Sequence, residues 1–149
     1  MKNYKDVIDK YNIPSNYIEF EITELTLLEN NELLRLTIEE IHQMGCLCSI
    51  DDFGSGYSSL TMIRDFDFDI VKLDRELFIG KNGFDEESKN IVSSIVNLCK
   101  VMNKNVVAEG IESEEQVEFL KSIGCNVIQG YYFAKPVPLE SYLELIKND

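Results

Sequence analysis

The stretch CLCSIDDFGSGYSSL, residues 46–60, holds the pattern on which the fold prediction rests. It opens with a short apolar run that predicts a buried strand, and two aspartates follow directly. Gly54 and Gly56 then give the backbone the freedom for a sharp turn. Because successive side chains of a strand point to opposite sides, Asp51 and Asp52 can reach one site only where the strand ends and the chain bends. A plain Asp/Gly turn before a serine-capped helix explains the same residues without a function.

Four other short runs, rich in β-branched and aromatic residues, predict strands of the same kind. Together with Cys46–Ile50, the predicted strands are Tyr17–Ile22, Ile70–Leu73, Asn105–Ala108 and Asn126–Ile128.

Segments with helical periodicity separate these strands. The predicted helices are Tyr4 to Tyr11, one that begins after Asn31 and stops at Gly45, one with the apolar stripe Ile91, Ile95, Leu98 and Met102, one opened by the Ser113–Gln116 capping box, and one from Pro138 through Ile146. Strand and helix therefore alternate, which is typical of an α/β fold with a parallel sheet and crossover helices.

The composition limits the partners that the chain can bind. Lys and Arg number 14 against 27 Asp and Glu, so the net charge is -13 and a nucleic acid polymer would be repelled. A small phosphodiester remains possible if metal ions reverse the charge locally. The four cysteines form no C-x-x-C pair and lie in apolar runs, which favours buried, reduced thiols in a cytoplasmic protein. Neither a signal peptide nor a membrane span is expected, because no apolar run is long enough.

Polar side chains follow each predicted strand, at or just past its carboxyl end. They are Glu21, Asp51 with Asp52, Lys72, Glu109 and Gln129. In a parallel α/β fold these ends meet at one rim, where barrel enzymes place their active sites. Carboxylates brought so close repel one another unless a proton, a cation or a lysine offsets their charge. Oxygen ligands suit Mg²⁺ or Mn²⁺ better than zinc, so the pattern predicts a site for a hard cation.

Five strings of the sequence resemble, in order and spacing, the signature of EAL-domain cyclic di-GMP phosphodiesterases. They are Glu21-Ile22-Thr23-Glu24, Asp51 to Leu60, Val71-Lys72-Leu73-Asp74, Ala108 to Glu112, and Gln129-Gly130-Tyr131. The resemblance covers essentially the whole chain and implies a partial TIM-like (β/α) barrel of about five parallel strands. It also implies that the parent protein hydrolyses cyclic di-GMP to linear pGpG by two-metal catalysis.

The resemblance further implies a role for each residue. The Mg²⁺ or Mn²⁺ ligands would be Glu21, Asp51, shared between two ions, and Asp52. The catalytic group would be Lys72, which steadies the attacking water, Glu109, which binds or deprotonates it, and Gln129. Supporting roles near the substrate fall to Glu24, Glu112 and Asp74. Two alternatives stay open: Lys72 forms a salt bridge to Asp51 or Asp74 at the rim, and Glu112 only caps the helix at Ser113. His42, in a predicted helix, is expected to face solvent and to take no part.

The sequence departs from the family pattern at its beginning. The Glu-Ala-Leu string of the first barrel strand and a metal-binding Asn are absent. We therefore expect residues 1–149 to be the C-terminal portion of a single EAL domain, inactive or weak alone. The alternatives are a degenerate module that binds cyclic di-GMP or a protein without hydrolysis, and a structural oligomerisation piece. Unpaired sheet edges also predict a dimer, an exchange of elements between copies, or a rearrangement of the chain around the gap.

Overall fold

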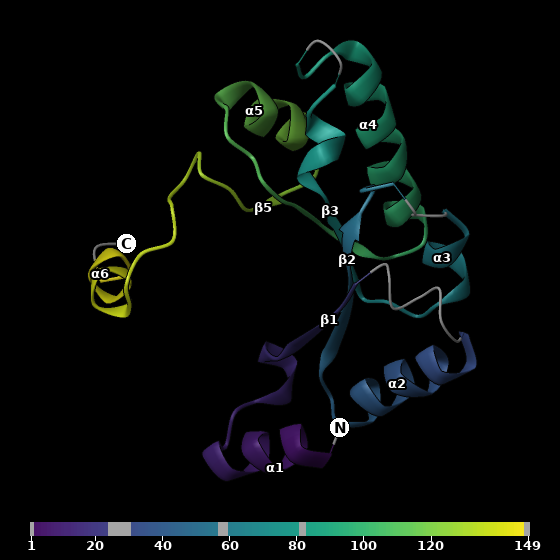
Figure 1. Ribbon diagram of the computed structural model, residues 1–149, viewed down its shortest axis with the longest axis vertical. Helices are drawn as coiled ribbons and strands as arrows, with labels where there is room; N and C mark the ends of the chain where they lie inside the picture. The colour runs from purple at the N-terminus through teal and green to yellow at the C-terminus, as the bar shows by residue number, and fades with distance from the viewer. Residues whose placement is uncertain (1, 24–30, 57–59, 81–82, 148–149) are drawn as a thin grey trace.

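The computed structural model describes residues 2–23, 31–56, 60–80 and 83–147, with a five-stranded parallel sheet at its centre (Figure 1). The strands are β1 (Glu19–Thr23), β2 (Leu47–Phe53), β3 (Ile70–Leu73), β4 (Asn105–Ala108) and β5 (Val127–Ile128). They lie side by side in chain order, and each neighbouring pair is parallel. The predicted α/β fold with about five parallel strands is confirmed. β1 starts later than expected because residues Ser15–Tyr17 form a 3-10 turn, η1.

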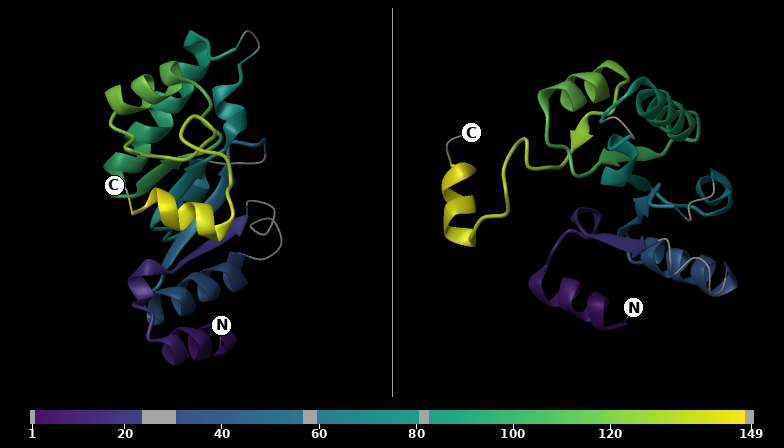
Figure 2. Two further views of the ribbon diagram at one scale, coloured as in Figure 1. Left: turned by 90° about the vertical axis from the view of Figure 1, so that its left-hand side faces the viewer. Right: turned by 45° about the horizontal axis from the view of Figure 1, so that its top comes forward.

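Helices connect the strands. α1 (Lys2–Tyr11) precedes β1, and the connections are α2 (Asn31–Gln43), α3 (Leu60–Asp65), η3 (Arg75–Phe78) with α4 (Glu86–Val101), and α5 (Glu114–Ser122), while α6 (Leu139–Leu145) follows β5. Right-handed crossovers between strands in sequential order place their helices on one side of the sheet. Figure 2 shows α2, α3, α4 and α5 following one another around the strands. None of the helices in the described ranges is long and apolar enough to span a bilayer.

The strand register determines which side chains share the other face of the sheet. Paired positions of parallel strands point their side chains to the same side, and so do residues two apart in one strand. The register pairs Glu21 with Ser49, and Lys72 with Val107. The face that the crossover helices leave uncovered, here called the open face, therefore carries the polar residues Glu21, Ser49, Asp51, Lys72, Glu109 and Gln129.

The hydrophobic core lies between the other sheet face and the helices. Its strand residues include Ile22, Cys48, Ile50, Val71, Leu73 and Ala108, and its helix residues include Leu34, Ile38, Ile41, Ile63, Val92, Val117 and Leu120. All four cysteines are buried and free, as predicted. Burial raises the pKa of the Cys48 thiol to about 12, which keeps it protonated and unreactive at neutral pH.

The predicted stripe of α4 is mostly confirmed. Ile95 is buried, and Leu98 and Met102 are partly buried against the core, but Ile91 is exposed. The buried face also contains Val92, Val96 and Cys99, which the predicted stripe left out. Apolar residues at helical spacing can be counted from either Ile91 or Val92, so periodicity alone does not fix the edge of the buried face.

The segment after β5 lies apart from the sheet. Residues 131–147 are exposed, and α6 buries none of its side chains. Figure 1 shows α6 in yellow at the end of an extended stretch, away from the other helices. The helix begins after Pro138 as predicted, but its apolar residues, Leu143 and Ile146 among them, do not enter the core. A helix of this length gains little stability from helix propensity alone.

Gly130 provides a test of the packing between the loop after β5 and the loop after β4. A Cβ atom at this position would overlap the backbone of Ile111, whose N–H donates to the Gln129 carbonyl at 3.1 Å. We expect Gly130→Ala to lower the free energy of unfolding by about 1–3 kcal/mol, because the loop after β4 must move away. Urea unfolding measures the change. Tyr131→Ala, at an exposed neighbouring position, is the control and should change little; equal losses in both variants would contradict the explanation.

Candidate active site

Three carboxylates surround one lysine on the open face. Lys72 Nζ lies 2.6 Å from Glu21 Oε1, 2.9 Å from Glu109 Oε1 and 3.1 Å from Asp51 Oδ1. The four residues come from β1, β2, β3 and the end of β4. The lysine side chain is 10% exposed, and those of Asp51 and Glu109 are 18% exposed. The prediction that the polar strand ends meet at one rim therefore holds for these four residues.

Backbone pairing holds the carboxylates in position. Glu109 lies just past β4, and its N–H donates to the Leu73 carbonyl at 3.0 Å, which extends the β3–β4 pairing by one residue. Lys72 sits in β3, the central strand, where all four residues are buried. Sites on strands are held more rigidly than sites on free loops, so the backbone that carries these side chains is fixed in position.

A β-bulge explains how two adjacent aspartates end the second strand. Between Ile50 and Phe53 the strand β2 advances three residues, whereas β3 advances two between Val71 and Leu73. The extra residue re-aims the side chains of a strand at that point. Asp52 has a left-handed backbone, with φ of 56°, and is exposed. The bend that the sequence required for these aspartates is thus present, although only Asp51 contacts Lys72.

The charges of the cluster perturb two of its members. Burial opposes the charge of Lys72, but its contacts with Glu21, Glu109 and Asp51 outweigh burial and raise its pKa, so it stays protonated at neutral pH. Burial also raises the pKa of Glu109, against the lowering effect of Lys72, and the charges of Asp51 and Glu21 raise it further. The cluster therefore holds a fixed cation and one carboxylate that gains a proton more readily than usual.

Two of the carboxylate oxygens are incompletely satisfied. The contact of Lys72 with Glu21 has the alignment of a hydrogen bond, at 2.6 Å. Asp51 Oδ1 and Glu109 Oε1 are buried and find no aligned hydrogen-bond donor in the described part of the chain, so they meet Lys72 through charge. Such oxygens are costly in a protein interior unless a cation or water completes them.

The other predicted residues lie around this cluster. Asp74 accepts a hydrogen bond from the Glu76 N–H at 2.7 Å and caps η3, so its side chain has a local partner. Glu112 forms an ion pair with Arg75 at 3.4 Å, while Ser113 and Gln116 form the capping box of α5. Asp74 and Glu112 are therefore held by neighbours outside the cluster. The predicted role of Glu24 falls outside the described residues.

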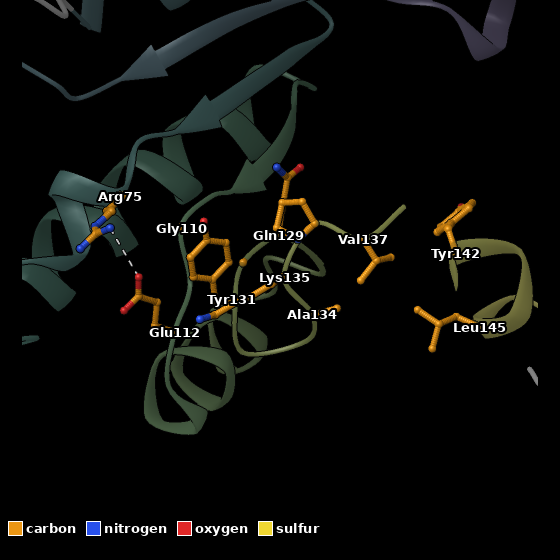
Figure 3. Close-up of a pocket in the computed structure, with 12 residues that line it drawn as sticks. Arg75, Gly110, Glu112, Gln129, Tyr131, Ala134, Lys135, Val137, Tyr142 and Leu145 are labelled. Atoms are coloured by element: carbon orange, nitrogen blue, oxygen red, sulfur yellow. Dashed lines mark ion pairs between the residues drawn. The ribbon is translucent and has the colours of Figure 1, made fainter. Parts of the chain in front are cut away.

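Gln129 borders a cavity beside the cluster. The cavity has a volume of about 620 Å³ and reaches from the ends of β4 and β5 to α6. Figure 3 shows Gln129 between Glu112 with Arg75 on one side and Val137, Tyr142 and Leu145 on the other. The residues that line it are Arg75, Gly110, Glu112, Gln129, Gly130, Tyr131, Ala134, Lys135, Pro136, Val137, Tyr142 and Leu145.

Sequence reasoning missed three residues near the site. Arg75 and Lys135 bring positive charge to the cavity of a strongly acidic chain. Arg75 directly follows the Val71–Asp74 string, so its place after a strand end was a usable signal. Lys135 lies in an irregular segment, where no pattern indicated its position. Ser49 lies on the open face two residues before Asp51, fully buried, and its hydroxyl has no hydrogen-bond partner among the described residues.

His42 lies at the opposite end of the sheet. Its Nε2 is 3.0 Å from Asp69 Oδ2, just before β3, and its side chain is 30% exposed. The prediction of a solvent-facing histidine was therefore only partly correct, because His42 joins α2 to the sheet. Its place at the amino ends of the strands separates it from Lys72 and the carboxylates.

Comparison with known proteins gives this arrangement a family. The family model described as "EAL domain" matches residues 1–136. The chain belongs to the EAL domain family. It is 36% identical over 143 residues to the cyclic di-GMP phosphodiesterase RocR of Pseudomonas aeruginosa, a match that spans 96% of this chain and 36% of RocR.

Solved structures of EAL proteins have the same fold. The PaMucR phosphodiesterase in complex with c-di-GMP matches with a TM-score of 0.82 and 36% identity, over 93% of this chain and 56% of that one. The Klebsiella pneumoniae BlrP1 manganese/cy-diGMP complex matches with a TM-score of 0.81 and 30% identity, over 89% of this chain and 34% of that one. The barrel-type α/β fold predicted from the EAL resemblance is thus confirmed, and the chain spans about half or less of these relatives.

The donor chemistry of the cluster fits a hard divalent cation. Glu21, Asp51 and Glu109 offer carboxylate oxygens from adjoining parts of one sheet face, and two of these oxygens are buried with no aligned donor from the described part of the chain. Oxygen donors are the ligands that Mg²⁺ and Mn²⁺ prefer. In the arrangement described, however, no group of three His, Cys, Asp or Glu side chains within the described ranges converges closely enough to hold an ion. The ammonium of Lys72 lies between them instead.

The raised pKa of Glu109 leads to a stability prediction. A carboxylate with a raised folded-state pKa costs stability when ionised, so the cost is present above that pKa and absent well below the ordinary value of 4.5. We expect Glu109→Gln to stabilise the metal-free chain at pH about 8, and the gain to vanish towards pH about 4. Glu112→Gln, at an exposed ion pair, is the matched control and should stay within about 0.5 kcal/mol of wild type. Urea unfolding at both pH values measures this, and destabilisation by Glu109→Gln at pH 8 would contradict it.

Proposed function

We propose that this EAL chain supplies metal-binding and catalytic side chains of a cyclic di-GMP phosphodiesterase that yields linear pGpG. The observation that carries the proposal is the cluster itself, in which Glu21, Asp51 and Glu109 meet around Lys72 at the carboxyl ends of parallel strands. Relatives over 90% or more of the chain are named cyclic di-GMP phosphodiesterases, which supports the substrate.

In this proposal Glu21, Asp51 and Asp52 hold Mg²⁺ or Mn²⁺. Bound divalent ions lower the pKa of a water, screen phosphate charge and stabilise a leaving oxygen. Asp51 is the candidate for a shared ligand, because it lies between β1 and β3 and has a buried oxygen with no aligned donor among the described residues. At the bulge Asp52 has a left-handed backbone, and a bulge redirects the side chains of its strand. This supports Asp52 as a further metal ligand at the same strand end as Asp51.

The remaining residues position and deprotonate the attacking water and support the loops beside the site. Lys72 orients the attacking water, and Glu109 binds it or accepts its proton, for which a raised carboxylate pKa is favourable. Gln129 lies on the open face, where its amide contacts the same water or the coordination shell of the metal. Glu24, Glu112 and Asp74 support the loops beside the site.

The cavity next to Gln129 suits part of a cyclic dinucleotide. Its volume of about 620 Å³ is in the range of small-ligand sites. Arg75 and Lys135 offer positive charge for a phosphate, and Tyr131 and Tyr142 offer aromatic rings for a base. A nucleic acid polymer is disfavoured by the net charge of -13. Four free buried thiols support a cytoplasmic location.

We further propose that the 149 residues correspond to the C-terminal portion of a single EAL domain. The span of only 56% of the PaMucR chain supports this, as does the open face of the sheet. The chain alone then lacks part of the metal site and is inactive or weak. The second candidate is a module that binds cyclic di-GMP without hydrolysing it; retention of the lysine and its carboxylates favours descent from an active enzyme.

Divalent ions should control nucleotide binding. We expect the chain to bind cyclic di-GMP at least about tenfold more tightly with Mn²⁺ than with a chelator, because the ions offset phosphate and carboxylate charge. Isothermal titration calorimetry measures the affinity. Asp51→Asn should remove the Mn²⁺ effect, and the control Asp67→Asn, at the other end of the sheet, should preserve it.

Chromatography of the products separates the two candidate functions. We expect little or no pGpG from the chain alone with Mn²⁺, and turnover at the rate of a complete enzyme would overturn the proposal that its site is incomplete. Binding that is equally tight without metal and in Asp51→Asn would favour the non-hydrolytic module.

We infer that a second copy of the chain covers exposed apolar helix faces. Leu139 and Leu143 of α6, with Ile146 just after it, are exposed at helical spacing beside Glu140. On α1, Tyr4, Val7 and Tyr11 are exposed beside Lys10 and beside Lys5, which also pairs with Asp9. Opposite charges flank the two apolar stripes, which supports α6 of one copy packing on α1 of another, reciprocally about a two-fold axis.

Light scattering during size-exclusion chromatography tests this association. We expect the mass of a dimer, and we expect Leu143→Glu to shift the equilibrium towards the monomer because it places a charge in the apolar stripe. Ser141→Glu adds the same charge to the same helix outside the stripe and is the control. A monomeric wild-type chain would show that the inference is wrong.

A further inference from the structure

The ammonium of Lys72 lies where the carboxylates would otherwise need a metal ion. We propose that Lys72 is the resident counter-ion of the site: it holds Glu21, Asp51 and Glu109 together before metal binds, and a divalent ion must displace it from Glu21 and Asp51. This inference rests on the metal site of the proposed function. It adds that Lys72 controls how readily a divalent ion binds there.

The carboxylates are arranged around an ammonium and not around a metal ion. Their oxygens lie 2.6, 2.9 and 3.1 Å from Lys72 Nζ, whereas Mg²⁺ requires oxygens at about 2.0–2.1 Å. Within the described ranges, these side chains do not lie close enough together to hold a metal ion. A bound ion and a charged lysine cannot occupy the same space, and their like charges repel. Metal entry therefore requires that the lysine move.

The order of the strands gives the direction in which Lys72 moves. β1 and β3 are not neighbours, since β2 lies between them, yet the shortest contact of Lys72 is with Glu21 on β1. Adjacent strands lie about 4.8 Å apart, so the lysine leans across β2 to make this contact. Glu109, by contrast, extends the neighbouring strand β4 and already lies 2.9 Å from Nζ. When an ion takes Glu21 and Asp51, Lys72 keeps its contact with Glu109.

The charge balance of the cluster favours the exchange of Lys72 for a metal ion. Three carboxylates against one ammonium leave an excess of negative charge in a largely buried cluster, so the site attracts a second or more highly charged cation. Without any cation the carboxylates would repel one another across the sheet face. The lysine thus stabilises the metal-free site and competes with the metal for the same oxygens.

Lys104 provides a matched control. Its side chain is 9% exposed, close to the 10% of Lys72, and it also contacts a carboxylate, Asp67 at 3.6 Å. It donates to the Phe68 carbonyl at 2.7 Å, which places it at the amino end of β3, opposite to Lys72. Removal of either charge disturbs a buried lysine, but only one of them faces the proposed metal ligands.

The test is a calorimetric titration of the chain with Mn²⁺ alone, without nucleotide. We expect Lys72→Met to bind Mn²⁺ at least about tenfold more tightly than wild type, and Lys104→Met to bind it as wild type does. Lys72→Met should also melt at a lower temperature without metal and show the larger rise when Mn²⁺ is added. Equal or weaker Mn²⁺ binding by Lys72→Met than by wild type would overturn the inference while the proposed function stands.

A second measurement uses the wild-type chain and does not depend on how the variant folds. The side-chain ammonium of Lys72 can be followed by proton–nitrogen NMR during titration with diamagnetic Mg²⁺. We expect its resonance to shift as the ion saturates the site, while that of Lys104 stays in place. A Lys72 resonance that is unchanged at saturation would overturn the inference. If neither wild type nor Lys72→Met binds a divalent ion, the metal site of the proposed function fails together with it.

Discussion

The contact of Lys72 with Glu21, Asp51 and Glu109 is the interaction on which the rest of the site depends. Parallel strands in sequential order direct all their carboxyl ends to one rim, so acidic residues at those ends must come close. Such a rim is stable only if a proton or a positive charge offsets the carboxylates. Lys72 supplies that charge from the central strand, and the neighbouring strands supply the carboxylates. The order of the strands therefore determines both the fold and the charge balance of the site.

The two ends of the sheet are used differently. At the carboxyl ends, buried oxygens find no aligned donor among the residues that the structure describes, and the pKa of Glu109 is raised, a combination that is common at functional sites. At the amino ends, Asp69 accepts hydrogen bonds from His42 and from the Cys48 N–H, and Lys104 caps the Phe68 carbonyl. Those groups are satisfied and join helix to strand. Function at one end and stability at the other is the usual division in barrel folds.

Much of this could be predicted from the sequence, because short apolar runs with polar ends are local signals. The β3 and β4 boundaries were predicted to the residue, and the acidic strand ends identified the members of the cluster. Long-range geometry could not be predicted. In α4 the predicted stripe wrongly included the exposed Ile91 and left out Val92, Val96 and Cys99, since two apolar series overlap in its sequence. That Lys72 reaches Glu21 across β2 depends on register and on the bulge at Asp52, which periodicity does not reveal. The exposed position of α6 and the contribution of Lys135 to the cavity were equally invisible, because both depend on an irregular segment.

The acidic strand ends of this EAL chain are proposed to form a divalent-cation site. Anomalous X-ray scattering from crystals of the chain grown with Mn²⁺ locates such an ion without reference to activity. We expect a manganese peak within bonding distance of the carboxylates of Glu21 and Asp51. Crystals in which these side chains are well ordered but the manganese binds elsewhere on the acidic surface would contradict it.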